Sequence, residues 1–171
     1  AERQASPVDR RPTTMAWGFP VANPAADLRA RALRLLARRE HSRAELRRKL
    51  SPHVEGGIDL EALLDDFTKR GWLSEERFVE QTVRAKSRKY GPLKIANHLR
   101  EKGIGEADIE SALSQAKSEE GEALASAWRT RFGRPPADDA EKAKQVRFLQ
   151  QRGFPLESVL RFLKAEPQDF A

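Results

Sequence analysis

The residues best suited to binding an external partner are basic side chains that stand off the apolar stripes of predicted helices. They fall into three groups, and the chain's single tyrosine belongs to the middle one. The candidate contact residues are Arg43, Arg47 and Arg48, then Arg88, Lys89, Tyr90 and Lys94, and finally Lys144 and Arg147. Such side chains predict contacts with phosphates or carboxylates, each worth about 1 kcal/mol and weakened by salt. The tyrosine is equally consistent with stacking on a partner and with joining two helices of the chain.

Residues that could do catalytic or metal chemistry are few and poorly spaced. No two histidines stand at a helical i, i+4 spacing, and cysteine is absent, so no metal site is predicted. His41 and His98 are expected to be ordinary surface or half-buried residues. Asp65 and Asp66 are adjacent on a predicted helix and point in different directions, which makes them poor general acid/base partners. We therefore expect a binding protein without catalytic residues or cofactor.

Charge alternates in sign along the chain. The net charge is +6 for residues 26–50, −5 for 51–83, +6 for 84–102, −5 for 103–128 and +5 for 129–164. The second helix of every predicted unit is expected to be basic and the third acidic. Stacked units would align the basic helices as a stripe, which is typical of a polyanion-binding surface. Alternatively, the basic helices pair with the acidic helices beside them, as on an ordinary solvated surface.

One apolar stripe with the period of an α-helix occurs three times, separated by 49 and then 47 residues. Its three copies are Leu60, Leu63, Leu64 and Phe67, then Ile109, Ala112, Leu113 and Ala116, and then Leu156, Val159, Leu160 and Leu163. Each interval leaves room for two further helices, and no strand-like alternation is present. The pattern predicts an all-α protein of three tandem three-helix repeats, stacked into an elongated crescent because each unit alone buries little.

Local signals mark where the helices begin and end. Ser42 with Glu45, and Asp138 with Glu141, form capping boxes at two helix starts. A glycine followed by an apolar residue predicts a Schellman stop at three places, namely Gly71, Gly103 and Gly153. The predicted helices span residues 26–40, 42–50, 59–70, 74–89, 92–102, 106–117, 119–132, 138–152 and 156–165.

Two tryptophans are predicted to lie in the core. Trp72 follows the glycine of a Schellman stop, and Trp128 shares a helical stripe with Leu124 and Phe132.

The repeats predict domains at residues 26–73, 74–118 and 119–166, between a disordered N-terminal tail (1–25) and a short C-terminal tail (167–171). The first tail contains several prolines, and its Met15, Trp17 and Phe19 could dock weakly. No run of about twenty apolar residues and no signal-peptide h-region is present. Together with the absence of cysteine, this favours the reducing cytoplasm.

Several segments carry a family resemblance. They are Arg39–Leu50, Gly71–Phe78, Lys89–Ile95, Leu99–Ile104, Arg131–Gly133 and Phe148–Phe154. In this order they resemble RecX, the family of bacterial regulators of the RecA recombinase. The resemblance spans roughly residues 28–165. It breaks at Ser51–Ile58, where the family usually closes the second helix of its first unit with a basic residue, a glycine and an apolar residue.

The resemblance implies that the chain lies in the helical groove of the RecA–single-stranded-DNA filament and spans neighbouring subunits. It further implies inhibition of ATP hydrolysis and strand exchange, and through them an effect on DNA repair, homologous recombination and the SOS response. We expect a monomer with no membrane partner, able to contact the single strand within the filament and to bind DNA directly but weakly.

Two other functions remain open from the residues alone. Three-helix units with a basic second helix resemble helix-turn-helix modules, so a regulator acting on naked DNA is the main alternative. The basic helices lack the Asn and Gln content typical of adenine recognition, and no dimerisation element is evident, which argues mildly against it. A helical scaffold for an acidic protein is consistent with the charge alone.

Overall fold

The computed structural model describes residues 23–165, so the predicted N-terminal tail up to Ala22 and the residues after Ala165 lie outside the described part. Within residues 23–165 the chain forms nine α-helices and no β-strand, which confirms the all-α fold. The helices are α1 (Pro24–Leu36), α2 (Arg43–Leu50), α3 (Leu60–Lys69), α4 (Glu75–Lys86), α5 (Pro92–Glu101), α6 (Glu106–Ala116), α7 (Glu120–Arg131), α8 (Asp139–Gln151) and α9 (Leu156–Ala165). Single turns of 3₁₀ helix, η1 (Ser51–His53) and η2 (Lys117–Glu119), follow α2 and α6.

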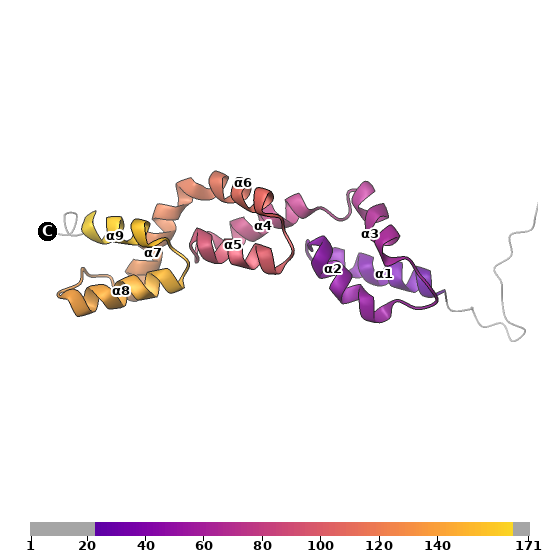
Figure 1. Ribbon diagram of the computed structural model, residues 1–171, viewed down its shortest axis with the longest axis horizontal. Helices are drawn as coiled ribbons and strands as arrows, with labels where there is room; N and C mark the ends of the chain where they lie inside the picture. The colour runs from indigo at the N-terminus through magenta and orange to yellow at the C-terminus, as the bar shows by residue number, and fades with distance from the viewer. Residues whose placement is uncertain (1–22, 166–171) are drawn as a thin grey trace, which may run out of the picture.

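Every three helices form a module with its own core, and the modules follow one another in an elongated row (Figure 1). Module 1 contains α1–α3, module 2 contains α4–α6, and module 3 contains α7–α9. Each core holds only seven or eight buried apolar residues. A unit of this size is marginal alone, so contacts between modules matter for stability. None of the helices in residues 23–165 has the length and apolarity needed to cross a membrane.

The predicted helix starts and stops are confirmed. The hydroxyl of Ser42 accepts the N–H of Glu45 at 3.1 Å, and Asp138 accepts the N–H of Glu141 at 2.7 Å. The glycines of all three stops have positive φ, as the left-handed C′ position requires. After Gly103, for example, the N–H of Ile104 reaches back 3.1 Å to the carbonyl oxygen of Leu99.

Two helices, α1 and α4, end earlier than predicted. Helix α1 ends at Leu36, after which Arg39 and Glu40 turn toward the boundary with module 2 and pair with Glu45 and Arg77. Helix α4 ends at Lys86, so the segment 87–90 forms a connection and not a last helical turn.

The structure shows where each apolar stripe lies within its helix. The third helices begin at Leu60, Glu106 and Leu156, so the stripes at Leu60 and Leu156 start with their helices, whereas the stripe at Ile109 starts three residues into α6. An apolar stripe at i, i+3, i+4 and i+7 overlaps with itself after a shift of three residues, so spacing alone does not define the register. The third helix is also not acidic in every module, because α9 carries Arg161 and Lys164 beside Glu157.

Of the two tryptophans, only Trp128 lies in the core. It is fully buried, and its indole N–H donates a 2.7 Å hydrogen bond to Gln145. Trp72 is 40% exposed, so its predicted burial is wrong. Trp72 does make the expected contact across the stop, because its ring lies edge-on to that of Phe67 with 5.4 Å between the ring centroids. The core position is instead filled by the following residue, Leu73.

The modules are joined through their second helices, which follow one another as α2, α5 and α8 from right to left in Figure 1. The hydroxyl of Ser42, the N-cap of α2, donates a 2.6 Å hydrogen bond to the carbonyl oxygen of Lys102, the C-cap of α5. The N–H of Gly91, the N-cap of α5, donates a 2.8 Å bond to the carbonyl oxygen of Arg152, the C-cap of α8. A helix leaves carbonyls unpaired at its end, and each joint satisfies one of them, through a side-chain hydroxyl at the first joint and through the N–H of an N-cap at the second. At both joints the negative end of one helix dipole meets the positive end of another.

The joint between modules 2 and 3 brings two backbones into contact at glycines. Gly153 has φ of +91°, and a Cβ built on it would lie 2.4 Å from the Cβ and 2.5 Å from the N of Lys94. A Cβ on Gly91 would lie 2.4 Å from the backbone of Gly153. Any larger residue at either position would push the modules apart.

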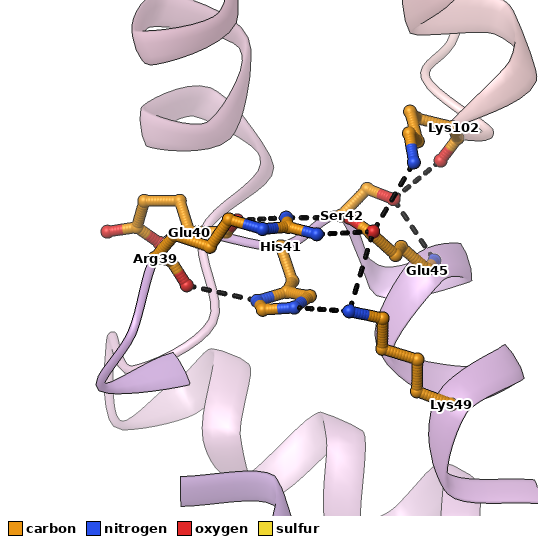
Figure 2. A network of polar contacts seen from close by, with 7 residues as sticks. All are labelled: Arg39, Glu40, His41, Ser42, Glu45, Lys49 and Lys102. Atoms are coloured by element: carbon orange, nitrogen blue, oxygen red, sulfur yellow. Dashed lines mark hydrogen bonds and ion pairs between the residues drawn. The ribbon is translucent and has the colours of Figure 1, made fainter. Parts of the chain in front are cut away.

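The joint between modules 1 and 2 is polar and centres on Glu45, whose side chain is only 3% exposed (Figure 2). Arg39 donates two hydrogen bonds to the carboxylate at 2.6 and 3.0 Å, and the Lys102 ammonium lies 3.3 Å from its Oε1. The bonds from Arg39 are the main reason why the pKa of Glu45 falls from 4.5 to about 2. The joint therefore forms around an ionised carboxylate.

His41 lies beside this network and is buried, not at the surface or half-buried as predicted. Its Nδ1 is 3.0 Å from the carbonyl oxygen of Arg39, and its Nε2 is 3.1 Å from the Nζ of Lys49 (Figure 2). These contacts fit a neutral ring that donates from Nδ1 and accepts at Nε2, and burial lowers the pKa of His41. His98 is half-buried, as expected.

Replacing Gly153 by Ala is expected to lower the free energy of unfolding by about 3 kcal/mol, through backbone strain at positive φ and the clash with Lys94. The matched control is Gly71→Ala, which shares the positive φ but has no atom within 4 Å of the added Cβ. It should cost only about 1 kcal/mol. Urea unfolding followed by circular dichroism measures both, and equal losses would contradict a tight joint.

Replacing Glu45 by Gln is expected to lower the free energy of unfolding by about 2 kcal/mol at neutral pH. The pKa of Glu45 is depressed in the folded state, so its stabilisation is complete above the unfolded-state pKa of about 4.3 and disappears as pH falls toward 2. Wild type and variant should therefore converge near pH 2 in urea unfolding measured across this range.

Glu61→Gln is the control for that experiment, because Glu61 also pairs with two arginines but at the exposed surface. Solvent screening should make its effect much smaller. A Glu45→Gln deficit that stays constant from pH 7 to pH 2 would contradict the role of the buried carboxylate.

Candidate nucleic-acid interface

Two predicted contact residues of module 1 are already engaged by the neighbouring helix α3. The guanidinium of Arg43 lies 2.8 Å from Glu61 and 2.7 Å from Asp65, and Arg47 donates to Glu61 at 2.5 and 2.8 Å. The hydrogen bond from Arg47 is the largest cause that lowers the pKa of Glu61 to about 2. In module 1 these basic residues therefore pair with the adjacent acidic helix, as the alternative interpretation of the charge pattern expected.

Three other predicted contact residues are exposed and have no carboxylate partner within residues 23–165. Arg48 lies on α2, and Lys144 and Arg147 lie on α8. In α9, which packs against α8, the first-turn carboxylate of Glu157 pairs with Arg161 of its own helix. Module 3 thus has no equivalent of the acidic α3 to neutralise α8.

In the middle group of predicted residues, Arg88, Lys89 and Tyr90 lie in the connection between α4 and α5, and Lys94 is exposed in the first turn of α5. Arg88 and Lys89 are exposed and make no ion pair within the described part of the chain. The N–H groups of Lys89 and Tyr90 both bond to the carbonyl oxygen of Lys86 at 2.9 Å, which forms a tight turn ahead of Gly91. Because Gly91 belongs to the joint, this turn lies directly against the end of α8.

Tyr90 packs against the core of module 2 and is surrounded by cations. The ammonium of Lys94 lies 4.8 Å from the ring centroid, that of Lys86 lies 5.6 Å away, and the guanidinium of Arg152 lies 5.9 Å away. Tyr90 therefore does join helices of the chain. The positive charge concentrated around its half-buried ring also suits a partner that is both anionic and aromatic.

An open cavity of about 580 Å³ lies across the joint between modules 2 and 3. It is lined by Arg88, Lys89 and Tyr90 from module 2 and by Ser126, Ala127, Thr130, Arg131, Phe148 and Arg152 from module 3. Four of these residues are basic and none is acidic. We call this the joint cavity.

The sequence predicted contact residues only on the module 2 side of the joint cavity. Arg131 and Arg152 did not stand out, because each ends a helix in its own module, about 40 or more residues after Arg88 in the chain. Contacts across the joint bring the two sides together, among them the hydrogen bonds from Gly91 to the Arg152 carbonyl and from the Arg152 side chain to the Lys89 carbonyl. The sequence predicted the helix stop at Gly153, but it did not predict that Gly153 would contact Lys94 of module 2.

The described residues contain no group of three or more His, Asp or Glu side chains placed to hold a metal ion. What the geometry offers is a positively charged, partly aromatic hollow.

Comparison with known proteins assigns the family. Three family models match, each describing one three-helix domain of RecX: the first at residues 29–53, the second at 74–113 and the third at 118–163. The regulatory protein RecX of Ralstonia nicotianae is 45% identical over 137 residues, which cover 80% of this chain and 86% of the relative. That of Ralstonia pickettii is 43% identical over 145 residues, which cover 85% and 91%. The chain belongs to the RecX family.

Solved RecX structures share the fold. The crystal structure of RecX from Lactobacillus salivarius aligns with a TM-score of 0.74 at 18% identity, covering 85% of this chain and 97% of that one. A second RecX crystal structure aligns with a TM-score of 0.68 at 24% identity, covering 82% and 71%. The match to the first RecX domain ends at residue 53, within the segment Ser51–Ile58 where the sequence departs from the RecX pattern.

The two roles of Tyr90 can be separated by stability. Replacing Tyr90 by Ala is expected to lower the free energy of unfolding by about 2 kcal/mol, since the half-buried ring leaves the module 2 core. Tyr90→Phe keeps the ring and should change it by less than about 0.5 kcal/mol. Thermal and urea unfolding measure both, and a fully stable Tyr90→Ala variant would contradict the joining role.

Proposed function

We propose that this chain is a non-enzymatic regulator that binds in the groove of the RecA–single-stranded-DNA filament. Bound there as a monomer, it inhibits ATP hydrolysis and strand exchange, and so modulates DNA repair, recombination and the SOS response in the cytoplasm. Membership of the RecX family supports a regulatory role, because the curated relatives are named regulatory proteins.

The row of modules suits a partner that is itself a repeating filament. Three small modules joined end to end present an extended surface, and the second helices run along it (Figure 1). An extended binder can contact successive subunits at once, which raises its avidity without a strong individual contact.

The observation that carries the proposal is the distribution of charge without internal partners. In module 1 the acidic α3 neutralises Arg43 and Arg47, whereas the basic residues of α8 and of the joint cavity have no carboxylate partner within residues 23–165. Charge left without internal partners over two adjacent modules favours an external polyanion or acidic surface.

The main alternative, a helix-turn-helix regulator of naked DNA, is disfavoured by the joints. Such modules read base edges with the N-terminal residues of a recognition helix. The N-termini of α2 and α5 are instead covered by the ends of α5 and α8. A third helix in that role is disfavoured in modules 1 and 2, where α3 and α6 are acidic.

A binding experiment at physiological salt tests the proposal. The chain is mixed with a RecA filament stabilised by an ATP analogue, with naked single-stranded DNA and with naked duplex, and the bound fractions are compared. The filament should retain most protein, and RecA ATP hydrolysis should fall as the chain is added. Sequence-dependent binding to the duplex with no preference for the filament would instead support the alternative.

Charge reversal locates the contact. Lys144→Glu with Arg147→Glu should weaken filament binding at least tenfold, because both side chains are exposed without a carboxylate partner in residues 23–165. Reversing Arg43 and Arg47 is unsuitable, since it would set new carboxylates against Glu61 and Asp65. The control is Arg31→Glu with Arg34→Glu on α1. Unchanged ATPase inhibition by the α8 variant would contradict the proposed contact.

A further inference from the structure

We infer that the joint cavity seats a phosphodiester group of single-stranded nucleic acid, with an adjacent base against the ring of Tyr90. The inference rests on the proposed function and specifies it, because it assigns the DNA contact within the filament to modules 2 and 3. Module 1 would then face protein.

Arg152 is the central observation. Three arginines of residues 23–165 are half-buried, namely Arg29, Arg43 and Arg152. Arg29 pairs with Asp66 at 2.9 Å and Arg43 with two carboxylates, whereas Arg152 has no carboxylate partner within these residues. The positive charge of Arg152 is therefore available to an external anion.

The guanidinium of Arg152 is also held in place before any ligand arrives. It lies 5.1 Å from the centroid of the Phe148 ring and 5.9 Å from that of Tyr90, and one NH group donates to the carbonyl oxygen of Lys89 at 3.3 Å. The guanidinium thus lies near two rings and one carbonyl of the cavity, and its remaining N–H groups are available to a ligand. That geometry suits bidentate recognition of a phosphate.

The other cations of the cavity lie around this anchor. Arg88 and Lys89 come from the turn after α4, and Arg131 comes from the end of α7. Arg88 also borders a second cavity, which is lined by Glu119 and Glu122. Glu122, however, forms an ion pair with Arg129 at 2.8 Å. The joint cavity itself therefore keeps a strongly positive lining.

The aromatic walls favour nucleic acid over an acidic protein segment. Carboxylate side chains would use the cations but gain nothing from the rings, whereas a nucleotide places a phosphate and a flat base next to each other. In a duplex the base faces are already stacked, so only an unpaired strand can use the ring of Tyr90. The cationic surface also extends beyond the cavity, because Lys144 lies on the same side of α8 as Phe148 and Arg152, at four-residue spacing.

The test is binding of a fluorescent oligothymidylate to the full chain over a range of salt concentrations. The cavity variant carries Arg88→Gln, Arg131→Gln and Arg152→Gln. Its control carries Arg31→Gln, Arg34→Gln and Arg38→Gln, three exposed arginines of module 1 without a carboxylate partner in the described residues. The cavity variant should bind at least tenfold more weakly, and its slope of log K against log salt should fall by up to about two. The control should stay within about twofold of wild type.

Equal losses in the two triple variants, or no oligonucleotide binding by wild type at low salt, would overturn the inference. Because Arg152 also contacts Lys89 across the joint, the double variant Arg88→Gln with Arg131→Gln is measured too. It leaves that contact intact and should still lose at least threefold. Wild-type filament binding is measured separately, so failure of the proposed function would be distinguishable from failure of this site.

A photo-crosslink identifies the occupant directly. An oligonucleotide carrying 5-iododeoxyuridine is irradiated with the full chain, and the adduct is mapped by mass spectrometry. An adduct on Tyr90 supports the inference, and adducts confined to module 1 overturn it. If polyaspartate displaces the oligonucleotide at equal charge concentration, and Tyr90→Leu leaves oligonucleotide affinity unchanged, the occupant is an acidic protein segment instead.

Discussion

The structure depends on one repeated contact, in which the carbonyl end of one second helix meets the N-terminal end of the second helix before it in the chain. Lys102 accepts from Ser42, and Arg152 accepts from Gly91, so the same C-cap position is used twice. Each contact satisfies a carbonyl that a helix end leaves unpaired, and it brings the negative end of one helix dipole against the positive end of another. The contact places α2, α5 and α8 in line and so determines that three small cores form an extended row (Figure 1).

The two joints achieve this alignment by different chemistry. The first surrounds the buried carboxylate of Glu45 with cations from both modules, so its stability depends on the ionisation of one group (Figure 2). The second relies on backbone hydrogen bonds and on the absence of side chains at Gly91 and Gly153. A titratable joint and a non-titratable one therefore lie side by side in one chain, and acid should loosen module 1 from module 2 before it separates modules 2 and 3.

The joints also decide which positive charges remain available to a partner. Within module 1, α2 faces the carboxylates of α3 and is partly neutralised. In module 3, α9 is not acidic, and the joint adds Arg152 and Arg131 to the cations that follow α4. Segments that look equivalent in net charge thus differ: α2 has Arg43 and Arg47 paired with α3, whereas α8 and the joint cavity keep basic residues without a carboxylate partner in residues 23–165. The crystal structure of RecX from Lactobacillus salivarius shares this fold.

What the sequence determined by itself was local. Helix starts at Ser42 and Asp138, and stops at Gly71, Gly103 and Gly153, were predictable because their hydrogen bonds join residues within about six positions. The all-α class and the existence of three units followed from the period of the apolar residues. Tertiary structure alone decided the exposure of Trp72, the burial of His41, the carboxylate partners of Arg43 and the assembly of the joint cavity. Most of these depend on which surfaces meet across about 20 to 60 residues of chain, as Arg43 meets Asp65 and Ser42 meets Lys102. The spacing of apolar or charged residues along a helix does not specify which neighbour that helix packs against.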